Sequence, residues 1–218
     1  MAIEQTTRTS RERSPLTRER ILAAALAIAD RDGLDGVSMR RIAQELKVAP
    51  MALYSHVRDK QELLLGLVDV VFGQINTDPP PGRWDDQLRV MARSLRSALL
   101  DHPAVVELAF LCASPGICQL AALERAHGIL RGAGLPDPVV ASASRGLYAY
   151  ILGAVMLELG GGAEGQRGGF LSLPADRFPN IAALTGHVAV CTGDDHFEYG
   201  LDLVLEGLAA QLRDGPSG

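Results

Sequence analysis

The segment SMRRIAQELKVAPMALYSHV, Ser38 to Val57, contains two short helical patterns separated by a three-residue turn. The pattern predicts a first helix over residues 38–46 and a turn at Lys47-Val48-Ala49. A second helix begins beside Pro50, which is favoured in a first helical turn because its missing N–H has no intrahelical partner there. Two helices of these lengths joined by a tight turn are typical of a helix-turn-helix, whose second helix enters the DNA major groove.

The side chains around this turn separate into an inner and an outer set. The inner, apolar set can hold both helices against a preceding helix: Ile42, Ala43, Leu46, Val48, Leu53 and Val57. The outer set comprises Met51, Ala52, Tyr54 and Ser55, with Arg40 reaching the groove from the start of the first helix. Short outer residues let the backbone approach base edges, and Ala and Met can pack on thymine methyl groups.

Basic residues are concentrated around this segment. Residues 1–60 contain 11 Lys+Arg against 8 Asp+Glu, a net of +3, whereas the remainder contains 10 against 18, a net of −8. Tyr54, His56 and Lys60 are the expected phosphate contacts, with Arg41 and Lys47 as lesser candidates. The arginines of the N-terminal arm either follow the DNA or belong to a solvated tail: Arg8, Arg11, Arg13, Arg18 and Arg20.

Helical periodicity dominates the rest of the 218 residues, 47% of which are hydrophobic, and no segment has sustained strand alternation. We therefore expect an all-α fold. A helix before the helix-turn-helix should begin near Thr17 and end before Asp32-Gly33, and Asp59-Lys60-Gln61-Glu62 has the form of a capping box. That capping box predicts a linking helix over about 60–74, and NTDPPPG at 76–82 predicts a helix stop and hinge. Further helices are expected over 84–100, 104–111, 116–132, 138–159 and 195–212, with a short helical turn at 180–188.

Enzymatic and membrane functions find no support in the sequence. There is no G-x-S-x-G, H-E-x-x-H or G-x-x-x-x-G-K motif, and the five His residues are scattered, so we expect no catalytic residues, cofactor or metal. Cys112, Cys118 and Cys191 lack metal-ligand spacing and suit a reducing compartment. Charges interrupt each apolar run, and the N-terminus lacks the apolar core of a signal peptide, which predicts a cytoplasmic protein that does not enter a membrane.

On spacing alone, a structural pair of helices without a role on DNA would also fit. However, SMRRIAQELKVAPMALYSHVRDKQELL resembles the N-terminal domain of the TetR family of transcriptional regulators, with LY-S-HV-x-x-K as its specific core. WDDQLRVMARSLRSALL and FEYGLDLVLEGLAAQL are similar to segments of the tetracycline-repressor branch. The resemblance implies a three-helix DNA-binding domain at 1–75, with its helix-turn-helix at about 38–57, and a larger helical ligand-binding and dimerisation domain at 76–218.

The resemblance also implies roles on double-stranded DNA with a palindromic operator. Arg40 matches the family's base-reading arginine, Tyr54 and His56 match aromatic residues that contact the DNA backbone, and Lys60 matches a phosphate-binding lysine. The tetracycline repressor has Gln, Pro and Thr where this chain has Pro50, Met51 and Ala52, which implies a different operator sequence.

Two C-terminal helices have patterns that suit a homodimer. The helix at 195–212 has a stripe of Phe197, Leu201, Val204, Leu205, Leu208 and Leu212, with Gly200 and Gly207 one heptad apart. The helix at 142–159 is apolar nearly all round, with Gly146 and Gly153 at the same spacing. Two such helices from each subunit would form a four-helix interface; the alternative is burial within one chain.

Family position implies the candidate ligand contacts Met91, Leu95, Phe110, Leu123, His127, Tyr148, Met156 and Glu158. The alternative for the apolar members is ordinary core, and Glu158 either holds a ligand cation or lies exposed at its helix end. Met91 and Leu95 replace an Asn and a Phe of the tetracycline repressor, and Ala109 falls near its magnesium-binding histidine. We therefore expect a metal-free apolar or polycyclic effector.

These features predict a sequence-specific transcriptional regulator, namely a repressor that a small-molecule effector releases from its operator. An activator is an alternative that the sequence leaves open. The alternative is a small-molecule-binding sensor or carrier without a role on DNA. The basic N-terminal part separates the two hypotheses, because a pure binding module has no need of Arg40, Tyr54, His56 and Lys60 on one surface.

Overall fold

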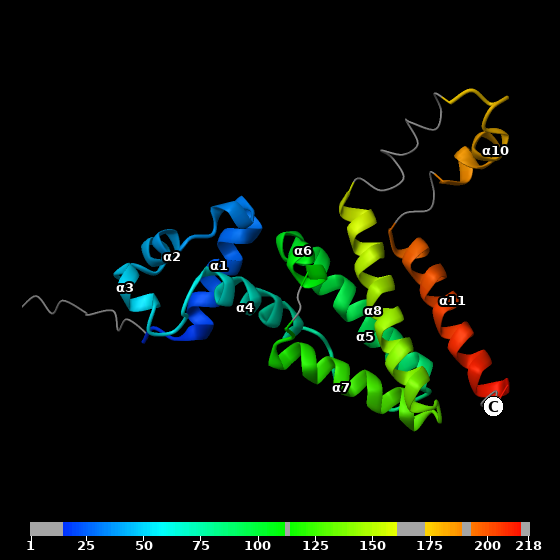
Figure 1. The fold of residues 1–218 in the computed structure, drawn as a ribbon, viewed down its shortest axis with the longest axis horizontal. Coiled ribbons are helices and arrows are strands. Elements are labelled where there is room, and N and C mark those ends of the chain that lie inside the picture. The colour runs from blue at the N-terminus through cyan, green and yellow to red at the C-terminus, as the bar shows by residue number, and fades with distance from the viewer. Residues whose placement is uncertain (1–14, 112–113, 161–172, 189–192, 215–218) are drawn as a thin grey trace, which may run out of the picture.

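The computed structural model describes residues 15–111, 114–160, 173–188 and 193–214, and within these ranges it is helical without strands. The DNA-binding helices predicted from the sequence lie at one end of the molecule and the remaining helices at the other (Figure 1). The elements are α1 Arg18–Asp32, η1 Leu34–Gly36, α2 Met39–Leu46, α3 Pro50–Leu53, α4 Lys60–Phe72, α5 Trp84–Asp101, α6 Pro103–Leu111, α7 Ile117–Gly132, α8 Asp137–Leu159, α10 Pro179–Val188 and α11 Gly193–Asp214.

Side-chain caps explain why the first helices begin where the sequence predicts. Thr17 Oγ1 accepts from Arg20 N at 3.3 Å, and Ser38 Oγ accepts from Arg41 N at 3.3 Å. At the start of α4, Asp59 Oδ1 accepts from Glu62 N at 2.8 Å. The reciprocal hydrogen bond of this capping box is made with the residue before the cap. Glu62 Oε2 accepts from Arg58 N rather than from Asp59 N.

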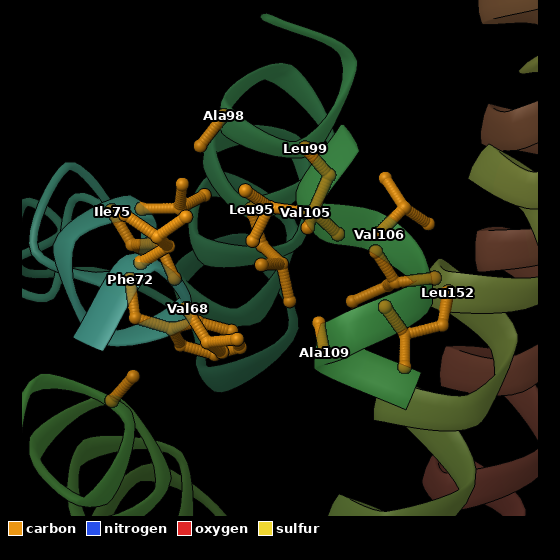
Figure 2. Close-up of a cluster of buried hydrophobic side chains, with 14 of the residues drawn as sticks. Val68, Phe72, Ile75, Leu95, Ala98, Leu99, Val105, Val106, Ala109 and Leu152 are labelled. Atoms are coloured by element: carbon orange, nitrogen blue, oxygen red, sulfur yellow. The ribbon is translucent and has the colours of Figure 1, made fainter. Parts of the chain in front are cut away.

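Helix α4 is shared by the two ends of the molecule. It packs against α1 on one side and against α6 and α7 on the other. Leu63 and Leu67 are fully buried, and near its end Val68 and Phe72 belong to the same buried cluster as α5, α6 and α8 residues such as Leu95, Val106 and Leu152 (Figure 2). The hydrophobic core is therefore continuous from the DNA-binding helices into the C-terminal helices.

The segment after α4 is attached to α5. Asn76 N donates to Ser94 Oγ at 2.8 Å, Asn76 Oδ1 accepts from Asp78 N at 3.0 Å, and Ile75 and Pro79 are buried. The helix stop predicted at 76–82 is thus present, and the segment is held to the C-terminal helices by polar and apolar contacts.

One sequence-based expectation is wrong. Helix α8 has 23 residues and contains an 18-residue window with a mean hydropathy of 1.4, so by length and composition alone it could cross a membrane. The sequence had predicted that charges interrupt each apolar run too often for a membrane span. In α8, however, Arg145 is the only charge between Asp137 and Glu158. In the structure α8 packs against α5, α6, α7 and α11, and 33% of its apolar window is buried within the chain.

A carboxylate from α4 caps the start of α7. Asp69 Oδ1 accepts from Cys118 N at 2.7 Å and from Gln119 N at 3.3 Å. The residue at the cap position itself is Gly116, where a Cβ would collide with the Asp69 carboxylate. The first turn of α7 is therefore satisfied by a helix about fifty residues earlier in the chain, which joins α4 and α7 by polar as well as apolar contacts.

We expect Asp69→Ala to lower the free energy of unfolding by about 1 kcal/mol, because two backbone N–H groups lose their acceptor. Asp69→Asn, which keeps an acceptor oxygen, should lose less. Urea unfolding followed by circular dichroism measures both. Glu107→Ala, at an exposed carboxylate on α6, is the control and should change stability by less than about 0.5 kcal/mol; an equal loss in this variant would contradict a specific cap.

Candidate nucleic-acid interface and ligand cavity

Burial around the turn separates the anchoring residues from the outward ones. Leu53, Val57 and Ile42 are at most 1% exposed, whereas Met51 is 77% and Tyr54 48% exposed. Pro50 and Ser55 are also exposed, and Ala52 and His56 are half-buried. The α3 helix covers only Pro50–Leu53 and continues as a turn. The outward surface of α3 is thus small and largely uncharged, which fits backbone approach and apolar base contacts.

Three cations near this surface are unpaired. Arg40 at the start of α2, Lys47 at its end and Lys60 at the start of α4 are exposed and form no ion pair with any residue that the structure describes. Lys47 closes the turn with a positive φ of 56°, so its left-handed backbone is what lets α3 follow α2 at once. Solvated, unpaired cations are the groups that can neutralise phosphates when DNA binds.

Arg41 and Ser55 differ from the other predicted contacts. Arg41 Nη2 lies 2.7 Å from Asp32 Oδ2, so its charge is already matched by α1. Ser55 Oγ donates to Ala52 O at 2.8 Å, and its hydroxyl proton is therefore used within the turn. The sequence pattern could not reveal either pairing, because each depends on how the chain is folded around the turn. Arg8, Arg11 and Arg13 of the predicted arm lie outside the described residues.

A cavity of about 580 Å³ lies among α4, α5, α7 and α8. This volume suits a drug-sized molecule. Most lining side chains are apolar, and the polar ones are few and come from α7 and α8. The lining residues are Phe72, Ile75, Leu88, Met91, Ala92, Leu95, Pro115, Gln119, Ala122, Leu123, Ala126, His127, Leu130, Ala141, Ser144, Arg145, Leu147, Tyr148 and Ile151.

The structure brings five of the eight candidate ligand residues together in this lining: Met91, Leu95, Leu123, His127 and Tyr148. Phe110 and Met156 do not line it, because they lie on outward faces of α6 and α8 and are 60% and 43% exposed. Glu158 does not line it either and is not a lone carboxylate. It pairs with Arg96 at 2.9 Å, and Arg96 also binds Asp194.

The end of α4 and three polar residues belong to the lining although the sequence did not point to them. Phe72 and Ile75 close the α4 side, and the Phe72 ring lies 6.1 Å from the Tyr148 ring. Tyr148 Oη donates to Ala109 O at 3.1 Å and accepts from Gln119 Nε2 at 3.4 Å. Arg145 had a signal in the sequence, because it is the only charge between Asp137 and Glu158 of α8. No sequence signal marked Phe72 and Ile75, because their pattern is that of ordinary core residues.

Comparisons with known proteins match both ends of the chain. Residues 21–67 match the family model described as bacterial regulatory proteins, tetR family, and residues 76–212 match the tetracyclin repressor-like, C-terminal domain. An HTH-type transcriptional regulator of Saccharopolyspora erythraea is 31% identical over 92% of this chain and 88% of its own. The HTH-type transcriptional repressor DrrR1 of Streptomyces coeruleorubidus is 32% identical over 88% of this chain and 77% of its own.

Among solved structures, apo ActR from Streptomyces coelicolor superposes with a TM-score of 0.82 at 36% identity and covers 92% of this chain and 98% of its own. ActR in complex with actinorhodin gives a TM-score of 0.81 at 35% identity, covering 91% of this chain and 99% of its own. The fold predicted from the sequence, with an N-terminal helix-turn-helix and a larger helical C-terminal part, is thereby confirmed.

We expect Arg40→Ala to weaken binding to the cognate DNA by about 1–3 kcal/mol and to relax base preference, because it removes the unpaired arginine beside the reading helix. Lys60→Ala should weaken binding to all sequences and reduce the slope of log K against log salt by about 1. Fluorescence anisotropy over a salt series, together with selection from random duplexes, measures both effects. Arg213→Ala, an exposed cation on α11, is the matched control. Unchanged base preference in Arg40→Ala would contradict its role as a reader.

Proposed function

We propose that this chain, which belongs to the TetR family of transcriptional regulators, is a cytoplasmic homodimeric repressor that a small apolar or polycyclic effector releases from a palindromic operator. The observation that carries this proposal is the position of α4. It begins at Lys60, after the turn that follows α3, and its last turn supplies Phe72 to the cavity wall. A molecule in the cavity therefore touches the same helix that supports the DNA-binding surface.

The coupling is a difference in affinity between two arrangements of α4. An effector that contacts Phe72 and Ile75 favours whichever arrangement fits it, and DNA favours the arrangement that sets two reading helices at the operator spacing. The cap from Asp69 to α7 ties α4 to a cavity wall at Gln119. A displaced α7 would then carry α4 with it, and no second route between the sites is needed.

The outer faces of α8 and α11 support the homodimer. A Cβ added at Gly146, Gly153 or Gly207 would have no described atom within 4 Å, so a partner helix has room to approach. Leu157 and Leu203 are 59% and 54% exposed. Gly200 does not belong to this open face, because a Cβ there would meet the Tyr150 hydroxyl, which donates to Phe197 O at 2.6 Å. Two-fold symmetry would place the reading helices on consecutive major grooves.

The alternative function, a sensor or carrier without a role on DNA, accounts for the cavity but not for the other end of the chain. Arg40, Lys47 and Lys60 stay unpaired around an exposed reading helix, whereas Arg31, Arg41 and Arg58 in the same part of the chain are ion-paired. Unpaired positive charges gathered on one surface favour a polyanionic partner.

The test is a titration of the purified protein against the DNA immediately upstream of its own gene and against an unrelated duplex of equal length, at two salt concentrations. Tight, salt-sensitive binding to the first duplex alone is expected, followed by release when a polycyclic aromatic compound is added. Selection from random duplexes covers the case of a distant operator. Failure to select any sequence would overturn the repressor and favour the carrier.

Filling the cavity separates the two functions. We expect Ala126→Trp, at a half-buried lining residue of α7, to weaken effector binding at least about tenfold while operator binding is retained, because the added ring occupies ligand volume. Ala121→Trp, at an exposed position of the same helix, is the control and should leave both affinities unchanged. Calorimetry with the effector and anisotropy with the operator measure the pair. Undiminished effector binding in Ala126→Trp would place the ligand elsewhere.

A further inference from the structure

Among the residues that the structure describes, the cavity lining has cationic and neutral groups but no carboxylate. Its titratable members are His127, Arg145 and Tyr148, and its other polar members are Gln119 and Ser144. Ser144 Oγ already donates to Val140 O at 2.8 Å, and Gln119 Nε2 donates a hydrogen bond to Tyr148 Oη. The charge that the lining offers to a ligand is therefore that of Arg145.

Arg145 is unpaired, unlike most of the arginines that the structure describes. Those of α5 bind the carboxylates of α8 and α11, as in the bidentate contact of Arg93 with Glu198 at 2.6 and 2.8 Å. Arg145 has no hydrogen bond, ion pair or ring contact with any described residue. Because Arg145 is exposed, its charge remains hydrated at little desolvation cost. The guanidinium therefore keeps all its N–H donors for a ligand.

The position of Arg145 on α8 places it at an edge of the apolar lining. The cavity side of α8 consists of Ala141, Ser144, Arg145, Leu147, Tyr148 and Ile151, which follow helical spacing. Ala141 and Arg145 are exposed, Leu147 and Ile151 are buried, and Tyr148 is half-buried against Phe72. A ligand that lies on the Tyr148 and Phe72 rings thus has a cation about one helical turn away, at the solvent side of the cavity.

We propose that the effector is an anionic molecule, with an apolar ring system inside the cavity and a carboxylate held by Arg145. Guanidinium groups bind carboxylates through two parallel N–H···O bonds, which orient the ligand as well as attract it. His127 lies in the same lining and adds a ring nitrogen without adding a negative charge. This inference rests on the proposed function, because it names the chemical class of the molecule that the cavity takes.

The test compares two probes that differ in charge: anthraquinone-2-carboxylate and anthraquinone-2-carboxamide. Calorimetry on the full-length protein is expected to give about tenfold tighter binding for the carboxylate, the size of a hydrogen-bonded charge contact. Only the carboxylate should lose affinity at high salt. In Arg145→Gln the preference should disappear because the carboxylate alone binds more weakly, and Arg145→Lys should keep part of it.

Arg131→Gln is the matched control, because Arg131 lies on α7 outside the lining and pairs with Asp137 at 2.9 Å. Retained operator binding checks the fold of each variant. Equal affinity of the wild-type chain for both probes, or an unchanged preference in Arg145→Gln, would overturn the anionic effector and leave the proposed repressor intact. If neither probe binds the wild-type chain, the polycyclic effector fails together with the inference.

Discussion

The burial of α4 on both sides is the constraint on which the rest of the structure depends. Leu63 and Leu67 belong to the same continuous core as α1, while Phe72 and Ile75 reach the cavity among the C-terminal helices. Each fully buried side chain of this size contributes about 1.5–3 kcal/mol. Separating α4 from either set of helices would cost several such contributions, so α4 can only shift together with what it touches.

Two polar contacts fix how neighbouring helices are oriented within this apolar core. The carboxylate of Asp69 fixes the start of α7 against α4, and the hydroxyl of Tyr148 fixes α8 against Ala109 of α6. Apolar burial is not directional, whereas a hydrogen bond specifies one partner. These two contacts border the cavity, so the residues that shape it are also those that define how α4, α6, α7 and α8 meet.

The distribution of charge distinguishes structural cations from those available to partners. The arginines of α5 join it to α8 and α11 through Glu158, Asp194, Glu198 and Asp202. Arg40 and Lys60 beside the reading helix, and Arg145 at the cavity, have no partner among the described residues. Exposed ion pairs contribute little to stability. Arg40, Lys60 and Arg145 are informative because their charges stay available at the two places where a ligand is expected.

The sequence by itself determined the helices and which side chains of α3 face outward. Thr17, Ser38 and Asp59 mark helix starts because a cap acts within three residues, and Leu53 and Met51 separate into buried and exposed positions because helical periodicity is local. Only the tertiary structure decided which apolar residues line the cavity, placing Phe72 there and Phe110 outside. It also paired Arg41 with Asp32 and Glu158 with Arg96, and it placed Tyr150 against Gly200. These outcomes depend on which helix faces meet, and no pattern within a single helix specifies that.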